Sequence, residues 1–150
     1  MSTDSIDVAC VALRNFVHVS GALRAQALIP MGGGLPAVVS CARLGPLEVV
    51  IGERAIELPH DAEIDAEAPD LGELRPMPPF EIDAERGEVA GVIGGLDVLR
   101  DAVVRIAEAI GGGAVVVAEL ESTTPDVPLA LSARAGEPVL VTLGDEQFDL

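Results

Sequence analysis

The stretch LEVVIGERAIEL at residues 47–58 recurs in altered form as VLVTLGDEQFDL at residues 139–150. In both stretches an alternating apolar run ends at a glycine, an acidic residue follows, and an apolar residue, an acid and a leucine close the stretch. Alternation of apolar and polar residues around a glycine turn is typical of a β-hairpin. The same hairpin at two places predicts that the chain contains an internal repeat.

The similarity extends upstream of the two hairpins at two different offsets. At an offset of 92 residues, LPAVVS at 35–40 matches VPLALS at 127–132, and Pro46 matches Pro138. At an offset of 81, DVACV at 7–11 matches EVAGV at 88–92, and Arg24, Ile29 and Gly32 fall opposite Arg105, Ile110 and Gly113. One duplication, with repeats at about 7–58 and 88–150, accounts for both offsets if the second copy carries eleven extra residues. The alternative is the ordinary resemblance of two Val-rich hairpins.

Secondary structure is clearest in the second copy. GEVAGVIG at 87–94 reads as a short strand, and an amphipathic helix follows because Leu99, Val103, Ile106 and Ile110 recur at helical spacing. Val- and Leu-rich strands are then expected at 114–121, 128–133 and 138–144. Each copy is therefore predicted as a β-α-β-β-β unit, with the first-copy helix at 15–29. The fold class is α+β with mostly antiparallel sheets.

Composition limits the functions that this chain can have. The sequence holds 25 acidic residues against nine arginines, with no lysine, and a net charge of −16. Such a charge repels nucleic acid and anionic membranes, so a protein or peptide partner that carries basic groups is expected instead. Exclusive use of arginine with abundant Ala, Gly and Val is typical of a GC-rich bacterial source. With no apolar run of about 18 residues and no positively charged leader, a cytoplasmic location is expected.

A single domain of two repeats is predicted, joined by a connector at about 59–87. The connector holds nine acids and five prolines, which favour an extended strap or a mobile linker. Its run HDAEIDAE would place Asp61, Glu63, Asp65 and Glu67 on one face of a strand, which predicts a solvated acidic edge and, as the alternative, a site for a divalent cation.

None of the residues that could carry chemistry forms a known catalytic set. Cys10 and Cys41 lie in apolar, strand-like surroundings and are expected to be buried, and His18 is expected in the core or an interface. The glycine triplets at 32–34 and 111–113 are expected to end helices, and GVIGG at 91–95 lacks the residues of a nucleotide loop. No enzyme, catalytic residue, cofactor or metal site is therefore predicted.

Two tandem β-α-β-β-β units joined by a long connector resemble one domain of a DNA sliding clamp. The resemblance is one of layout over most of the chain, and it implies helices inside and sheets outside. Clamp helices that line DNA are expected to be basic, yet the helix at 96–110 carries Asp97, Asp101 and Glu108 beside Arg100 and Arg105. A clamp-like architecture used for protein assembly is therefore expected, and encirclement of DNA is not.

Two partner surfaces follow from these expectations. A helix at 15–29 would be apolar almost all round, which predicts a homo-oligomer with Phe16, Val19 and Leu23 at the interface. The clamp resemblance implies a peptide groove between the copies, with Met77, Phe80, Phe148 and Leu150 as anchors; alternatively, Phe80 and Phe148 complete the core. The predicted function is non-catalytic protein–protein interaction, and the alternative is a small-ligand or divalent-cation module, such as a degenerate enzyme, that uses the cleft between the copies.

Overall fold

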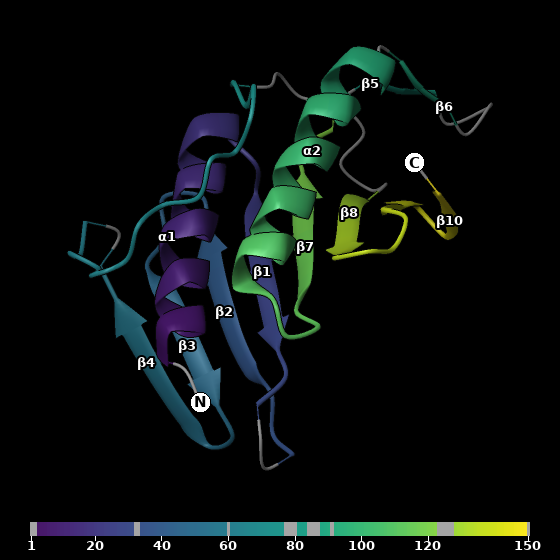
Figure 1. The fold of residues 1–150 in the computed structure, drawn as a ribbon. Coiled ribbons are helices and arrows are strands. Elements are labelled where there is room, and N and C mark those ends of the chain that lie inside the picture. The colour runs from purple at the N-terminus through teal and green to yellow at the C-terminus, as the bar shows by residue number, and fades with distance from the viewer. Residues whose placement is uncertain are drawn as a thin grey trace.

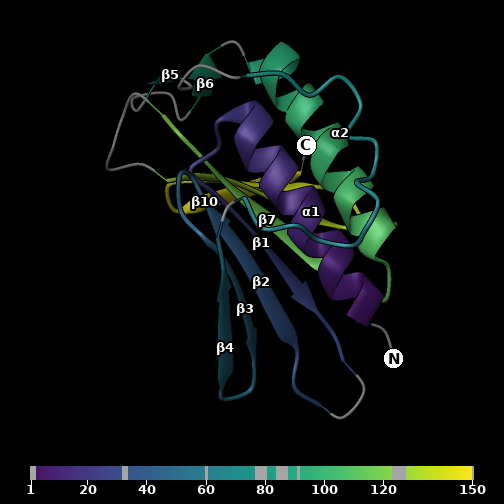
Figure 2. The same ribbon diagram turned by 90° about the vertical axis from the view of Figure 1, so that its left-hand side faces the viewer.

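The described residues form an eight-stranded antiparallel sheet with two helices packed side by side on one of its faces (Figures 1 and 2). The computed structural model describes residues 3–31, 34–59, 61–76, 81–83, 88–90, 92–122 and 128–149. The predicted α+β class with antiparallel pairing is confirmed. Neither described helix combines the length and the apolarity that crossing a membrane would require.

Each half of the chain supplies one helix and four strands of the large sheet. The first half comprises α1 (Thr3–Ser20), β1 (Arg24–Ile29), β2 (Ala37–Ala42), β3 (Leu47–Ile51) and β4 (Arg54–Leu58). The second half comprises α2 (Val92–Ile110), β7 (Val115–Leu120), β8 (Leu129–Arg134), β9 (Leu140–Leu143) and β10 (Glu146–Asp149). Between them lies a separate hairpin of β5 (Glu81–Asp83) and β6 (Glu88–Ala90).

The strand order β10-β9-β8-β7-β1-β2-β3-β4 reads symmetrically about the central pair of β1 and β7. The register has the same symmetry. Arg24 pairs with Glu119, and Leu28 pairs with Val115. A shift of 91 residues relates position 24 to 115 and position 28 to 119, so it exchanges the two pairs. Further out, the pair of residues 37 and 51 in β2 and β3 corresponds to the pair 129 and 143 in β8 and β9, at a shift of 92. The two similar hairpins thus lie at corresponding places on opposite edges of the sheet.

Within each half, the helix and the strands of the large sheet follow the order α-β-β-β-β, which corrects the predicted β-α-β-β-β unit. In the second copy the short strand expected at 87–94 is found as β6 before α2, but it pairs with β5 outside the large sheet, and in the first copy no described strand precedes α1. Residues 7–11, expected as a strand, belong to α1, and residues 24–29, expected as helix, form β1. The offset of 81 therefore matched a strand to a helix. The two helices instead correspond at a shift of 90, since Gly21 and Gly111 end them with φ of +76° and +71°. In both, the glycine amide donates to the carbonyl four residues earlier at 2.9 Å.

One cluster of buried side chains joins the helices to the sheet and spans both halves. In α1 the buried stripe follows helical spacing through Ala9, Leu13 and Phe16, and in α2 it runs through Leu99, Val103 and Ile106. The inward strand positions alternate with outward ones, as in Ala25, Ala27 and Ile29 of β1. This stripe overrides the local preference of the Val-rich sequence for strand and makes residues 3–20 helical.

The first part of the connector, residues 61–76, is a strap that crosses the outer side of both helices (Figure 2). The Arg14 guanidinium of α1 donates to the Ala62 carbonyl at 2.5 Å, and Arg105 of α2 forms an ion pair with Asp70 at 3.5 Å. Three apolar side chains of the strap pack partly buried against the core: Ile64, Leu71 and Leu74. Of the two expectations for the connector, this part follows the ordered strap.

Candidate functional site

The face of the sheet opposite the helices carries a continuous line of apolar side chains. The register places them side by side across β4, β3, β2, β1 and β7, in the order Ala55, Val50, Val38, Leu28 and Val115. We call this line the apolar row. All five side chains are at least partly exposed, Leu28 at 39%. No described helix or strand packs on this face, so the row is open to a partner.

The corresponding line of the second half is polar. The register aligns Gln147, Thr142, Ala130, Glu119 and Arg24 across β10, β9, β8, β7 and β1. Gln147 donates to the Thr142 hydroxyl at 3.3 Å, and Glu119 lies opposite Arg24. The two lines occupy corresponding places in one sheet, yet one is apolar and the other is mostly polar. The apolar row is therefore not a general property of this sheet face.

Between the two lines, the middle of the outer face is uncharged. Ser40, Gln26, Val117 and Ser132 lie next to one another in register across the four central strands. Ionised side chains return at the edges, with Glu48 and Glu57 on β3 and β4 and Asp149 on β10. In a chain with a net charge of −16, this central surface is suited to contact with another protein.

A groove of about 430 Å³ adjoins the β1–β7 end of the apolar row. Leu28 and Val115 form one wall, and Arg134, the next residue in register on β8, stands at its rim. The loop after β1 closes the groove with Pro30, Met31, Gly34 and Pro36. Leu35 of the same loop is 60% exposed, so apolar surface continues beyond the row.

A second groove, also of about 430 Å³, lies between the end of α1 and the turn that joins β2 to β3. Val17, His18, Cys41 and Leu44 contribute to its lining. In this turn, the Arg43 guanidinium donates hydrogen bonds to the Glu121 carboxylate at 3.2 Å and to the Gly21 carbonyl. His18 is exposed, so it does not lie in the core, and its alternative place in an interface stays a prediction.

The two thiols are buried, as predicted, although Cys10 lies in α1 and only Cys41 lies in a strand. Burial, with a smaller contribution from Asp7, raises the pKa of Cys10 from 9.0 to about 11, and burial also raises the pKa of Cys41. Both thiols are therefore protonated at neutral pH, which makes them poor nucleophiles.

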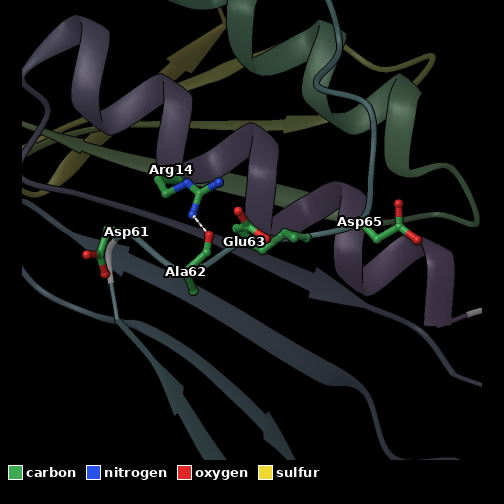
Figure 3. Close-up of a pocket in the computed structure, with 6 residues that line it drawn as sticks. Arg14, Asp61, Ala62, Glu63 and Asp65 are labelled. Atoms are coloured by element: carbon green, nitrogen blue, oxygen red, sulfur yellow. Dashed lines mark hydrogen bonds between the residues drawn. The ribbon is translucent and has the colours of Figure 1, made fainter.

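The acidic part of the strap forms an open hollow of about 820 Å³ beside Arg14 (Figure 3). Asp61, Glu63 and Asp65 alternate on its exposed side, but the segment is not the strand that we expected. Figure 3 shows their carboxylates spread along the strap rather than converging. Calcium needs six to eight oxygens that converge at about 2.3–2.6 Å. Within the described ranges, no group of three or more His, Cys, Asp or Glu is placed to hold a metal ion.

Of the four residues that the sequence marked as partner anchors, the structure describes only the backbone of Phe148, so the predicted peptide groove stays a prediction. Met77, Phe80 and Leu150 lie outside the described residues. Phe148 is in β10, in register with Val141, and its side chain is not described.

The three residues of the expected oligomer interface lie in different surroundings. Phe16 is fully buried in the core, Val19 is half-buried near the end of α1, and Leu23 is 41% exposed just before β1. The predicted all-apolar helix at 15–29 does not exist, because Gly21 ends α1 and the rest forms β1. The expectation that the triplet at 32–34 ends a helix is likewise wrong, since it follows β1, whereas the triplet at 111–113 does follow α2.

The apolar row was missed, although the sequence held a signal for it. A strand with one solvated face alternates, yet AVV in β2, VVI in β3 and VVVA in β7 are apolar at successive positions. Successive apolar residues are typical of strands with two buried faces. The register was needed to show that these extra apolar residues form one line.

No family model, curated protein or solved structure matches this chain. The resemblance to a sliding clamp therefore stays a prediction from layout.

Proposed function

We propose that this protein is a non-catalytic assembly protein that binds another protein through the open face of its sheet. The observation that carries the proposal is the apolar row, five neighbouring side chains on a face that no described element covers. Burial of apolar surface contributes about 25 cal/mol per Å². A partner that covers the row gains this free energy without having to desolvate a charge at its centre.

We also propose that the two halves arose by duplication of one α-β-β-β-β unit. The matching registers, related by shifts of 91 and 92 residues, support this origin. After a duplication both halves would have started with the same outer line. The difference between the apolar row and its polar counterpart is then a specialisation of the first half for binding.

The side chains that could carry chemistry favour binding over catalysis. The two thiols are protonated at neutral pH. In the groove that contains the exposed His18, Arg14 and Arg43 each donate a hydrogen bond to a backbone carbonyl. The clamp-like architecture expected from layout is compatible with this proposal but is not required by it.

Site-directed cross-linking tests the proposal. Val50→Cys places a thiol in the apolar row, and Thr142→Cys places one at the corresponding position of the polar line. Because Cys10 and Cys41 are buried, a thiol-reactive photo-cross-linker will label the new cysteine selectively. Cross-linking in a lysate of the source cells, followed by mass spectrometry, should give a defined protein adduct from position 50 and none from position 142.

Equal adducts from both positions would mean that the row is not a specific surface. Absence of an adduct from position 50 would contradict the proposal directly. The melting temperature of each variant should stay within a few degrees of the wild type, because both positions are partly exposed.

A further inference from the structure

We infer that the protein that covers the apolar row is a second copy of this chain, packed face to face about a twofold axis that runs along the strands. This inference rests on the proposed function, since it names the partner of the same surface. It moves the expected homo-oligomer contact from the first helix to the outer face of the sheet.

The apolar row is complementary to itself under this axis. An axis along the strands, between β2 and β1, sets Val38 of one copy opposite Leu28 of the other and Val50 opposite Val115. In the neighbouring line, Ser40 then faces Gln26, and the Glu48 carboxylate of β3 faces Val117. Within the row apolar groups meet apolar groups, and no two like charges are placed opposite each other. The Glu48 carboxylate opposite an apolar side chain opposes association and favours a weak dimer.

The ends of the row decide between the possible axes by their charge. Arg134 stands at the β8 end, and Glu57 lies two residues from Ala55 at the β4 end. An axis along the strands brings the Arg134 end of one copy to the Glu57 end of the other, at both ends of the interface. An axis along the row would instead place Arg134 of one copy opposite Arg134 of the other, where the two like charges repel. Opposite charges at the rim fix the orientation, while the apolar centre supplies affinity.

The available area is sufficient for a weak dimer. With strands about 4.8 Å apart and a rise of about 3.3 Å per residue, the six strands from β4 to β8 offer roughly 24 Å by 17 Å in projection. Side-chain relief makes the accessible surface larger than this projection, and the exposed loop around Leu35 adds to it. Stable interfaces bury about 800 Å² per partner, so this face, with roughly 400 Å² in projection, belongs with the smaller interfaces of weak complexes. A dissociation constant near about 1–100 μM is expected.

The test is sedimentation velocity on the full chain from about 1 to about 300 μM, a range that brackets the expected dissociation constant. The wild type should change from the 15.4 kDa monomer to twice that mass. Val50→Glu should weaken dimerisation at least tenfold, because it buries an unpaired charge. Thr142→Glu adds the same charge at the corresponding position of the polar line and should dimerise as the wild type does.

A charge reversal tests the axis. Arg134→Glu and Glu57→Arg should each weaken the dimer about two- to fivefold, and the double variant should recover most of the loss. Failure of the double variant to recover would overturn the axis along the strands. A monomer at every concentration, or a dimer that Val50→Glu leaves intact, would overturn the second copy as partner.

The cross-linking at position 50 separates this inference from the proposed function. An adduct with another protein, together with a monomeric wild type, would leave the proposed function standing and remove only the second copy. No adduct and no dimer would remove both.

Discussion

Leu44 holds a backbone conformation that leucine rarely adopts. Its φ is +59°, and its side chain is 96% exposed in the turn between β2 and β3. The corresponding position in the turn between β8 and β9 is Gly136, with φ of +81°. Left-handed backbone costs a residue with a Cβ about 1–2 kcal/mol, whereas glycine adopts it freely. One half of the molecule thus carries a strain that the other half avoids.

Replacing Leu44 with glycine should stabilise the protein. The relief of strain exceeds the extra chain entropy that glycine loses, so we expect Leu44→Gly to raise the free energy of unfolding by about 0.5–1 kcal/mol. Urea denaturation measures the change. The reciprocal control, Gly136→Leu, should lower the free energy of unfolding by about 1–2 kcal/mol. A loss of stability in Leu44→Gly would show that the exposed leucine makes a contact that offsets its strain.

The two thiols make stability depend on alkaline pH. The pKa of Cys10 rises from its ordinary value of 9.0 to about 11 in the fold, so above pH 9 the unfolded chain loses a proton that the folded chain keeps. Stability is therefore complete below pH 9 and decreases between pH 9 and 11. A rise of this size corresponds to at most about 2–3 kcal/mol for this thiol. Cys41, whose pKa is also raised, adds to the same fall.

The composition allows a fall in stability at alkaline pH to be assigned to the cysteines. The chain has no tyrosine and no lysine, so its cysteines are the only side chains whose ordinary pKa falls between about pH 8 and 12. Urea unfolding under reducing conditions at several pH values should show the decline in the wild type. The Cys10→Ala/Cys41→Ala variant, less stable throughout, should show a nearly flat profile over that range. An equal slope in both proteins would contradict the role of the thiols.

At the scale of single elements, the sequence predicted the second half and the hairpin at 47–58 well and misread residues 7–29 of the first half. The helix expected at 96–110 was found as α2 (Val92–Ile110), and the strands expected after it are β7, β8 and β9. Gly111 and the uninterrupted apolar stripe of α2 mark these boundaries. In the first half, β-branched residues and Phe16 lower helix propensity within α1, while Ala25 and Ala27 raise it within β1. Burial against the partner half reverses both local preferences, and the sequence does not contain that information locally.

The strap depends on a close approach at Gly72. Its φ is +72°, and a Cβ there would collide with a carboxylate oxygen of Asp101, which accepts a hydrogen bond from Arg105 at 2.8 Å. Gly72→Ala should therefore strain the backbone and also displace Asp101 from Arg105. We expect the free energy of unfolding to fall by about 2–3 kcal/mol. Chemical denaturation measures the loss, and hydrogen exchange should show weaker protection where the strap crosses α2.

Gly112 provides the matched control for the strap. It has a φ of +64° with no atom within 4 Å of an added Cβ, so Gly112→Ala carries the backbone strain without the contact. The difference between the two variants isolates the attachment of the strap to α2. Equal losses in both would mean that the attachment contributes nothing to stability.

At the scale of the whole molecule, like charges oppose the folded state. The chain carries 25 acidic residues against nine arginines, and its isoelectric point is about 4.2. The ion pairs that join described residues are solvent-exposed, such as Arg105 with Asp101 and Arg134 with Glu137. Exposed pairs contribute only about 0–1 kcal/mol each, so screening them costs little. Screening the repulsion among the excess acids must therefore dominate the response to salt.

Raising NaCl from about 0.02 M to about 0.5 M should accordingly stabilise both the fold and the proposed dimer, because the Debye length shrinks from about 20 Å to about 4 Å. We expect the melting temperature, measured at a protein concentration where the monomer prevails, to rise by about 3–6 °C, which corresponds to about 1–2 kcal/mol. The strap supplies the control. Replacing Asp61, Glu63, Asp65 and Glu67 with their amides removes four charges from an exposed segment, and this variant should melt higher at low salt and respond less to added salt. A melting temperature that falls with salt would mean that the ion pairs, rather than the repulsion, control the stability of this acidic fold.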